Sequence, residues 1–429
     1  MKVLVVGSGG REHAIIRKLK ESPQKPELYA APGSGGIAYD AQCVPIAATD
    51  IAGVVEFAVR EQMDYVVVAP EDPLALGMVD ALAEKGIPAF GPNKAAAIIE
   101  GSKVFSKGLM EKYGIPTARC QTFGKADEAA AYVRANKTYP LVVKADGLAT
   151  GKGVLICENE AEALAAVKGM MEDGQFGASG SRVVIEEFLT GPEVSVLCFT
   201  DGKTLVPMPS SMDHKRALDG DAGLNTGGMG TIAPNPCYTA DIAAVCMETI
   251  FKPTIAAMNA EGRTFRGCLY FGLMLTPDGP KVIEYNCRFG DPEAQVVLPL
   301  LETDLLAVMQ ATTNGTLGEM DVTFSDKHAA CVIVASGGYP QHYEKGKTIM
   351  GLTNGQLPGT GATVYHAGTA RQGETLVTSG GRVLGVTAVA DTLPQALADA
   401  YRAADNVYFE GMYKRTDIGQ RALRAVQGA

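Results

Sequence analysis

The sequence predicts a multidomain protein of the α/β and α+β classes that begins with a doubly wound parallel sheet. Its 429 residues exceed what one hydrophobic core usually holds. In the first hundred residues, apolar runs such as 3–6 and 65–69 alternate with helical stretches. This alternation is typical of a parallel sheet covered by helices on both faces. Beyond residue 123, short strands and glycine-rich turns predict smaller α+β units.

We expect four parts. Residues 1–103 form an N-terminal α/β domain that binds a substrate. Residues 104–122 and 194–326 form a central domain, 123–193 a small mobile lid, and 327–429 a C-terminal mixed α/β domain. In the lid, we expect strands at 141–145, 154–157 and 183–187, and helices at 126–136 and 160–171. Ala161, Leu164, Val167 and Met171 would form the buried stripe of the second helix. The C-terminal part should hold a helix from Pro394 to about residue 407.

Composition excludes several classes of protein. A net charge of −10 gives no footprint for nucleic acid or an anionic membrane. Nine cysteines lie scattered between Cys43 and Cys331 without a C-x-x-C pair, and the five histidines lack zinc spacing, which indicates reduced thiols. The first apolar run ends at Gly7, and no run reaches the roughly 18 residues of a membrane helix. We therefore expect a cytoplasmic protein with no membrane partner.

The motif Gly7-Ser-Gly-Gly-Arg-Glu-His13 follows the first strand and should open a helix. Glycines let a backbone approach a phosphate, which a helix N-terminus favours. A dinucleotide fingerprint would need a third glycine where Glu12 stands. The motif therefore predicts a phosphate-binding loop, with a tight βα turn that binds nothing as the alternative.

Lys144 lies within the apolar strand 141–145 and leads into the glycine-rich hairpin 147–153. Burying a lysine is costly unless an anion pairs with it. A loop of this kind can fold over phosphates while the lysine neutralises their charge. The Gly-Lys-Ser/Thr ending of a Walker A loop is absent, and a flexible hairpin beside a surface lysine is the alternative.

A pair of acids ends the strand at Val184-Ile-Glu-Glu-Phe-Leu189, and Glu193 follows shortly after. A strand in this position can present backbone groups to an adenine and a carboxylate to ribose. By itself the pattern is weak, because neighbouring glutamates usually lie on a solvated surface.

The segment from Lys281 to Glu293 carries the strongest signal. Because side chains alternate along a strand, Glu284 and Asn286 should share one face. Two oxygen ligands on a rigid strand suit Mg²⁺, which shares its remaining positions with water and phosphate. Arg288 follows two residues later and can bind a phosphate or carboxylate with two donors. An edge strand with polar residues facing water is the alternative.

The stretch Gly223-Leu-Asn-Thr-Gly-Gly-Met-Gly230 follows the polar run Asp213-His-Lys-Arg216. Successive N–H groups in such a loop can hold an oxyanion or an acyl phosphate. A surface loop is the alternative, although long glycine-rich loops in compact domains are more often functional.

Together these motifs resemble the ATP-grasp superfamily and, within it, the phosphoribosylamine–glycine ligase family. The resemblance covers nearly the whole chain and includes Gly91-Pro-Asn-Lys-Ala-Ala-Ala and Glu100-Gly-Ser-Lys103-Val-Phe. It implies an ATP-dependent ligase of purine biosynthesis that joins glycine to 5-phosphoribosylamine through glycyl phosphate, with Mg²⁺ or Mn²⁺ as cofactor. ADP, phosphate and glycinamide ribonucleotide would be the products.

The resemblance also implies roles for individual residues. ATP would contact Lys103, Lys144, Gly147, Gly151, Gly153, Glu186, Glu187, Phe188, Leu189 and Glu193. The catalytic set would be Lys144, Asp213, Arg288 and Asp291. Gly9, Gly10, Arg11, Asp213, Gly227, Gly228, Arg288 and Asp291 would bind the other substrates. Glu284 and Asn286 would hold the metal.

One departure concerns the strand before the metal strand. Many ATP-grasp sites carry a second acidic ligand there, but residues 269–275 contain no acid. We expect water or Glu293 to complete the coordination. Two rivals are a biotin-dependent carboxylase subunit of the same architecture and a nucleotide sensor without activity. The complete set of Lys144, Glu284, Asn286 and Arg288 argues against the sensor.

Overall fold

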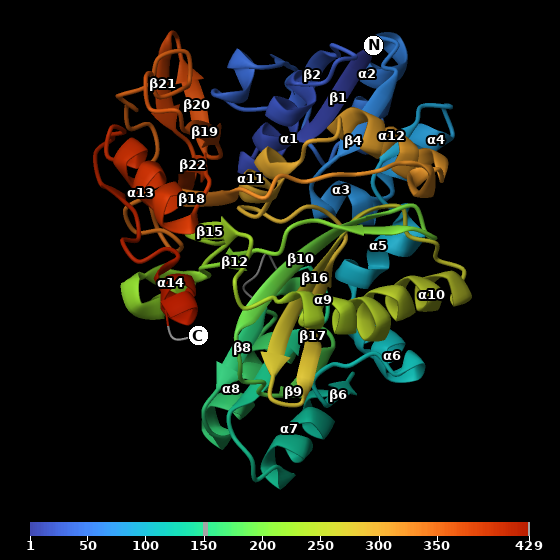
Figure 1. The fold of residues 1–429 in the computed structure, drawn as a ribbon. Helices are drawn as coiled ribbons and strands as arrows, with labels where there is room; N and C mark the ends of the chain where they lie inside the picture. The colour runs from blue at the N-terminus through green and yellow to red at the C-terminus, as the bar shows by residue number, and fades with distance from the viewer. Residues whose placement is uncertain (149–152, 428–429) are drawn as a thin grey trace.

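The computed structural model describes residues 1–148 and 153–427. Its N-terminal part is a parallel sheet in the order β3-β2-β1-β4-β5, as the sequence predicts (Figure 1). The strands are β1 (Lys2–Gly7), β2 (Glu27–Pro32), β3 (Gln42–Cys43), β4 (Tyr65–Val68) and β5 (Ala89–Phe90). The helices are α1 (Gly10–Lys20), α2 (Ile51–Arg60), α3 (Glu71–Leu76), α4 (Met78–Ala83) and α5 (Lys94–Gly101).

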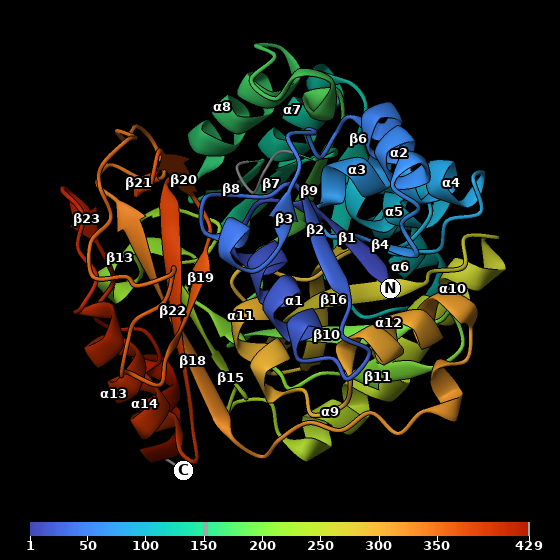
Figure 2. The same cartoon turned by 90° about the horizontal axis from the view of Figure 1, so that it is seen from above.

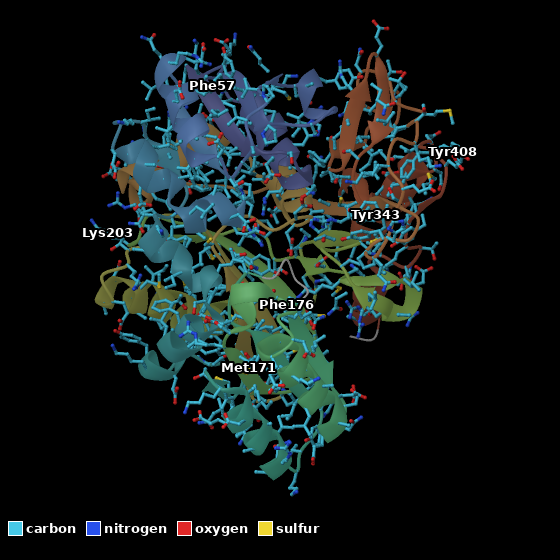
Figure 3. All side chains as sticks on the ribbon, turned by 180° about the vertical axis from the view of Figure 1, so that it is seen from behind. Phe57, Met171, Phe176, Lys203, Tyr343 and Tyr408 are labelled. Atoms are coloured by element: carbon cyan, nitrogen blue, oxygen red, sulfur yellow. The ribbon has the colours of Figure 1, made fainter. Side chains whose placement is uncertain are left out.

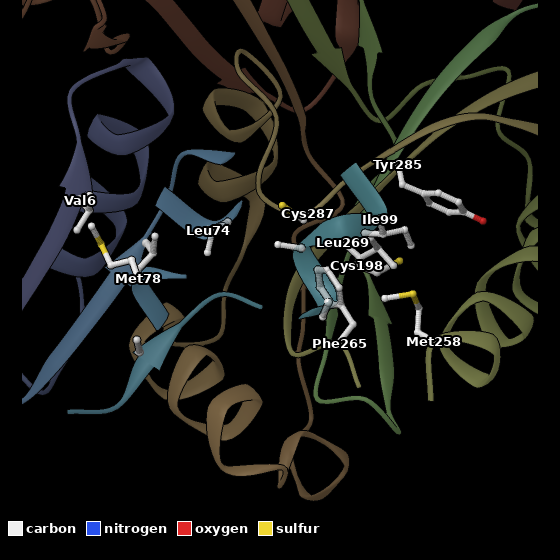
Figure 4. Packing of buried hydrophobic residues seen from close by; sticks show 14 of the residues in the cluster. Val6, Leu74, Met78, Ile99, Cys198, Met258, Phe265, Leu269, Tyr285 and Cys287 are labelled. Carbon is white, nitrogen blue, oxygen red and sulfur yellow. The ribbon is translucent and has the colours of Figure 1, made fainter. Parts of the chain in front are cut away.

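Strand β1 is buried on both faces, which explains its unbroken apolar sequence. Val3 and Val5 pack in one core with α1 residues and with residues of α12 (Leu305–Asn314). Leu4 and Val6 face a second core shared with α2 and with the central sheet. Figure 4 shows Val6, Leu74 and Met78 at one end of this second core and Leu269 and Tyr285 at the other. The continuous packing ties the N-terminal and central parts together.

The part around residues 120–187 extends away from the rest of the molecule (Figure 1). It is an antiparallel sheet in the order β6-β9-β7-β8 with two helices. Its elements are β6 (Cys120–Phe123), α7 (Ala126–Ala135), β7 (Leu141–Ala145), β8 (Val154–Cys157), α8 (Glu160–Met171) and β9 (Val183–Glu187). It has its own small core.

The stripe expected on α8 is partly wrong. Ala163, Ala166, Val167 and Met170 are buried, whereas Ala161 is exposed. Val167 is buried as expected, and Leu164 and Met171 are partly buried against the same core. The helix instead turns small alanines inward, and these allow it to pack closely on β7 and β8.

The central sheet is antiparallel, in the order β11-β10-β16-β17. Its strands are β10 (Glu193–Thr200), β11 (Leu205–Pro207), β16 (Gly267–Thr276) and β17 (Gly279–Asn286), and α6 (Lys103–Tyr113), α9 (Ala240–Cys246) and α10 (Lys252–Ala260) accompany it. Leu109, Met110 and Ile115 from α6 and its end join the core formed by β16 and β17. The hairpin β13 (Arg216–Leu218) and β14 (Ala222–Asn225) stands apart.

The C-terminal sheet runs β12-β15-β18-β22-β19, with β23 beside β18. Its strands are β12 (Met212–Asp213), β15 (Gly230–Ala233), β18 (His328–Ser336), β19 (Thr363–His366), β22 (Arg382–Ala390) and β23 (Met412–Tyr413). Strands β20 (Thr369–Gln372) and β21 (Thr375–Thr378) form a separate two-stranded sheet. The remaining helices are α11 (Ala294–Val297), α13 (Leu393–Ala404) and α14 (Gln420–Gln427). Strands β12 and β15 thus join a sheet built mainly from residues beyond 327, so the glycine-rich stretch connects two parts of the molecule.

Viewed from above, the C-terminal sheet lies beside α1 (Figure 2). Buried histidines connect the two. The backbone N–H of His366 donates to His13 Nδ1 at 2.8 Å, so His13 carries its proton on Nε2, which lies 2.9 Å from Asp40 Oδ2. His366 Nε2 lies 2.8 Å from the carbonyl oxygen of Gly355. Burial, helped by the neighbouring His13, lowers the pKa of His366 to about 3.

Figure 3 shows side chains such as Lys203 and Tyr408 at the periphery, and both are exposed. Within the described residues, no helix is both long and apolar enough to cross a membrane.

The pKa of His366 predicts a pH dependence of stability. An unfolded histidine takes up a proton near pH 6.5, whereas folded His366 stays neutral down to about pH 3. Unfolding therefore binds a proton between these values, and the free energy of unfolding falls as the pH drops below about 6.5. His366→Gln should reduce this slope by up to about 1.4 kcal/mol per pH unit. Urea unfolding at several pH values measures it, with the exposed His342 as the matched control, His342→Gln. Equal slopes for wild type and His366→Gln would contradict the assignment.

Candidate functional site

Strand β17 presents Glu284 and Asn286 on one face. Val282 and Tyr285 enter the core. Gly272 pairs with Glu284 and Leu273 with Val282, so the strand bulges at Ile283, which has no partner on β16. Glu284 and Asn286 are partly buried and point away from that core. A Cβ on Gly272 would lie 3.1 Å from Glu284 Cγ, so a larger residue there would crowd this side chain.

Positive charge surrounds the Glu284 carboxylate. Lys215 Nζ lies 3.9 Å from Glu284 Oε1 and 3.1 Å from Glu193 Oε2. Burial would raise the pKa of Glu284, but Lys215, Lys144 and Lys103 outweigh it and lower the pKa. Glu284 therefore stays ionised at neutral pH. A small cavity lined by Ser195, Asp213, Lys215, Tyr270 and Ile283, among others, adjoins it.

Lys144 and Glu186, both expected at the nucleotide, form an ion pair. Lys144 Nζ lies 2.9 Å from Glu186 Oε2 and donates to the carbonyl oxygen of Ile283 at 3.2 Å. A second buried lysine, Lys107, lies 3.1 Å from Glu186 Oε1. Burial lowers the pKa of Lys107, and Glu186 opposes this effect. Lys107 has no signal in the sequence, because nothing in a helical sequence marks a lysine that turns inward.

The start of α6 touches the loop after β7. Lys103 Nζ donates to the carbonyl oxygen of Gly147 at 3.1 Å. Asp146 Oδ1 accepts from Ser102 Oγ and from the N–H of Val104, both at 2.8 Å. Lys103 therefore lies beside Gly147, the first residue of the expected hairpin. Gly151, also expected at ATP, lies outside the described residues.

The other residues expected at the nucleotide lie on the exposed end of β9 and beyond. Glu187 pairs with Arg119, whose Nη2 lies 2.8 Å from its Oε2. Burial raises the pKa of Glu187, but the hydrogen bonds and charge of Arg119 outweigh it. Phe188 and Glu193 are exposed and Leu189 is half-buried. An exposed edge of this kind is accessible to a ligand.

Arg288 has protein carboxylates on both sides. Its Nε lies 3.0 Å from Glu71 Oε2, and its Nη2 lies 2.9 Å from Glu100 Oε1. Burial would lower the pKa of this guanidinium, but Glu100 and Glu71 raise it well above its ordinary value. The sequence predicted that Arg288 can bind a phosphate or a carboxylate with two donors, and here it pairs with two protein carboxylates. The structure therefore leaves Arg288 with part of its donor capacity already used.

The phosphate-binding expectation for residues 7–11 conflicts with the groups found there. The N–H of Gly9 donates to Glu12 Oε2 at 2.6 Å, and the N–H of Arg11 donates to Asp291 Oδ2 at 3.3 Å. Two protein carboxylates therefore face the N-terminus of α1, where they interact favourably with the helix dipole. Gly10 gives room to Gln295, because a Cβ there would lie 2.5 Å from Gln295 Nε2. In this conformation these amides do not form an open phosphate cradle.

Several N–H groups of the stretch 223–230, which was expected to hold an oxyanion, have partners within the protein in this conformation. The N–H groups of Gly227, Gly228 and Met229 donate to Tyr339 Oη, Thr226 Oγ1 and His214 O at 3.1, 2.9 and 2.8 Å. The glycines allow neighbouring side chains to approach the backbone closely. A Cβ on Gly228 would lie 2.5 Å from Asp213 Oδ1, so the loop packs directly on that carboxylate. Burial and the neighbouring Glu293 raise the pKa of Asp213.

Arg382, at the start of β22, joins two motifs that are distant in sequence. Its Nη1 donates to Gly227 O at 2.6 Å and to Asp291 O at 2.7 Å, and its Nη2 lies 3.4 Å from Asp291 Oδ1. Asp291 also accepts from Gln295 Nε2 at 2.8 Å. Segments from the N-terminal, central and C-terminal parts therefore meet at Asp291.

Sequence reasoning missed Glu71, Glu100, Lys107 and Arg382. Each is far in sequence from the group that it contacts. Glu100 alone had a signal, because it opens the motif Glu100-Gly-Ser-Lys103 that also supplied Lys103.

The fold has been seen in solved structures. A phosphoribosylamine–glycine ligase from Thermotoga maritima is 35% identical, covers 97% of this chain and all of its own, and superposes with a TM-score of 0.85. A biotin carboxylase from Campylobacter jejuni superposes with a TM-score of 0.75 at 14% identity over 96% of this chain and 92% of its own, which shows a shared fold alone. With the lysines and β17, this architecture defines an ATP-grasp enzyme.

The family follows from the sequence. Residues 1–100, 101–294 and 329–421 match the N domain, the ATP-grasp (A) domain and the C domain of phosphoribosylglycinamide synthetase. Phosphoribosylamine–glycine ligases from Allochromatium vinosum and Vibrio cholerae are 47% and 46% identical, with 99% and 100% of both chains covered. The chain belongs to the phosphoribosylglycinamide synthetase family, whose members are carbon–nitrogen ligases of purine biosynthesis.

The contacts of Arg382 predict a loss of turnover without a loss of nucleotide binding. Arg382→Ala should release the 227–228 loop from Asp291 and lower kcat about 10- to 100-fold, because small misplacements in a site are costly. Arg382→Lys should lose less, since lysine can reach some of these oxygens but cannot bridge them all. Steady-state turnover and calorimetry with ADP measure the two effects. The exposed Arg402 supplies the control, Arg402→Ala. Wild-type kcat in Arg382→Ala would contradict the role.

Proposed function

We propose that the chain joins glycine to 5-phosphoribosylamine with ATP, through glycyl phosphate, to give glycinamide ribonucleotide, ADP and phosphate. One observation carries the proposal: the partly buried Glu284 and Asn286 share a face of β17 opposite Lys103, Lys144 and Lys215. Such a set of oxygen ligands and cations suits the polyphosphate of ATP with its metal. Membership of the family supports glycine and 5-phosphoribosylamine as the two further substrates of the proposal.

The donor set fits a hard dication. Glu284 offers an ionised carboxylate and Asn286 an amide oxygen, and such oxygens are the ligands that Mg²⁺ or Mn²⁺ takes. Among the described residues, no group of three or more histidine, cysteine or acidic side chains is arranged for a metal. Phosphate oxygens and water would therefore supply the remaining positions. The bound cation would neutralise charge on the phosphoryl group that is transferred.

The chain's own groups would act in two steps. A carboxylate oxygen of glycine attacks the γ-phosphorus while Lys144 and Lys103 neutralise the phosphates. ADP leaves, and glycyl phosphate remains. The amine nitrogen then attacks the acyl carbon and phosphate leaves. Asp213, whose pKa burial and Glu293 raise, would take the proton that the amine releases.

The remaining assignments are part of the same proposal. Gly147, Gly151, Gly153, Glu186, Glu187, Phe188, Leu189 and Glu193 would surround ATP. Gly9, Gly10, Arg11, Gly227, Gly228, Arg288 and Asp291 would shape the site for glycine and the ribosylamine. The division into parts 1–103, 104–122 with 194–326, 123–193 and 327–429 likewise remains a proposal, with 123–193 acting as the lid.

The experiment is a phosphate-release assay with ATP and glycine or phosphoribosylamine, supplied together and singly. Full turnover should need both substrates. Turnover that depends on bicarbonate and biotin would favour a carboxylase instead. ATP binding without phosphate release under any of these conditions would indicate a nucleotide sensor.

Removing the charge of the metal ligand should slow the reaction and spare the fold. Glu284→Gln keeps the shape and one oxygen but loses the charge that attracts a dication. We expect kcat to fall about 100-fold or more, which corresponds to about 3 kcal/mol in the barrier. Thermal melting should change little, because Glu284 points away from the core. Turnover across a magnesium titration is the measurement, and near-normal turnover at low magnesium would place the metal elsewhere.

A further inference from the structure

The carboxylate of Glu100, near the end of α5, contacts the three consecutive residues 286–288 at the end of β17 and just beyond it. It is almost fully buried, at 9% exposure. Its Oε2 accepts from the N–H of Cys287 at 2.7 Å, and its Oε1 accepts from Arg288 Nη2 at 2.9 Å. A buried carboxylate with this many donors has little freedom to rotate. The third residue that it contacts is Asn286.

The neighbours of Asn286 determine which way its amide points. One terminal atom of the side chain lies 3.0 Å from Glu100 Oε1 and 3.3 Å from the carbonyl oxygen of Tyr285. Both neighbours are acceptors, so this atom is the nitrogen Nδ2. The amide oxygen is consequently turned away from Glu100. A rotation by 180° would bring the oxygen against two acceptors and forfeit both hydrogen bonds.

We propose that Glu100 is a positioning residue for the metal site: its carboxylate keeps the Asn286 oxygen turned outward, ready to bind the cation. The inference rests on the proposed role of Glu284 and Asn286. An amide can offer either its oxygen or its nitrogen, and only the oxygen binds a hard dication. Groups that orient a metal ligand through its other atom typically affect affinity about 10- to 100-fold.

Glu71 offers a matched control. Both carboxylates pair with the guanidinium of Arg288, through Nε at 3.0 Å for Glu71 and Nη2 at 2.9 Å for Glu100. Among the contacts of the described residues, Glu71 has no hydrogen bond to Asn286. Glu71→Gln therefore perturbs Arg288 and leaves the amide orientation alone, whereas Glu100→Gln perturbs both.

The experiment measures Mn²⁺ binding to the full chain with ADP and without glycine, by electron paramagnetic resonance. We expect Glu100→Gln to raise the Kd for Mn²⁺ about 10-fold or more and Glu71→Gln to change it less than about 2-fold. Glu284→Gln should also raise the Kd. If Glu100→Gln and Glu71→Gln raise the Kd for Mn²⁺ equally while Glu284→Gln also raises it, the positioning role is overturned and the metal site stands. A wild-type Kd for Mn²⁺ in Glu284→Gln would overturn the assignment of the metal site and this inference with it.

A second pair of variants tests the same contact from the side of Asn286. Asn286→Asp would place a carboxylate about 3 Å from Glu100, and the two like charges would repel. Adding Glu100→Gln restores a donor opposite the new acceptor. The double variant should bind Mn²⁺ about 10-fold more tightly than Asn286→Asp alone. No gain in the double variant would contradict the proposal.

Discussion

The pairing of buried charge at the end of β17 is the constraint on which the site depends. A guanidinium removed from water needs partners, and Arg288 finds Glu71 on one side and Glu100 on the other. Both acids belong to helices of the N-terminal part, Glu71 to α3 and Glu100 to α5, so the pairing connects the end of β17 to that part. Arg11 joins the network through Glu71 and through the carbonyl oxygen of Phe289. The result is a rigid corner from which Glu284 and Asn286 project.

The same need for partners explains how the C-terminal part enters the site. Asp291 receives donors from the backbone of Arg11, from Gln295 and from Arg382. The donors to this carboxylate therefore come from three distant segments of the chain. The glycine-rich loop is held on the opposite side by Tyr339 and Arg382. The acceptor half of the proposed site would therefore be built from several parts of the chain, and the proposed nucleotide half would lie between the central sheet and the part around residues 120–187.

The sequence was informative where function follows from local periodicity. The alternation along β17 is enough to put Glu284 and Asn286 on one face, and the apolar runs are enough to predict the parallel sheet. It was not informative about partners. Nothing near Arg288 reveals that Glu71 and Glu100 will pair with it, because those contacts join residues 217 and 188 positions apart.

For a related reason, the glycine motifs do not reveal which groups lie against them. A glycine-rich sequence indicates that a backbone needs room, but it does not say what fills that room. At Gly9 and Gly228 the neighbours are the carboxylates of Glu12 and Asp213. The amides of Gly9, Gly227 and Gly228 are bound within the protein. Only the three-dimensional arrangement distinguishes a glycine that admits a protein side chain from one that admits a ligand.

The central claim, that ATP activates a carboxylate as an acyl phosphate, can be tested by following an oxygen atom. Glycine labelled with ¹⁸O in its carboxylate would be supplied with ATP and phosphoribosylamine, and the released phosphate analysed by mass spectrometry. Attack of the carboxylate on the γ-phosphorus transfers one of its oxygens, so the account predicts one ¹⁸O in each phosphate formed by ligation. Unlabelled phosphate, formed at the same rate as the amide product, would contradict the account.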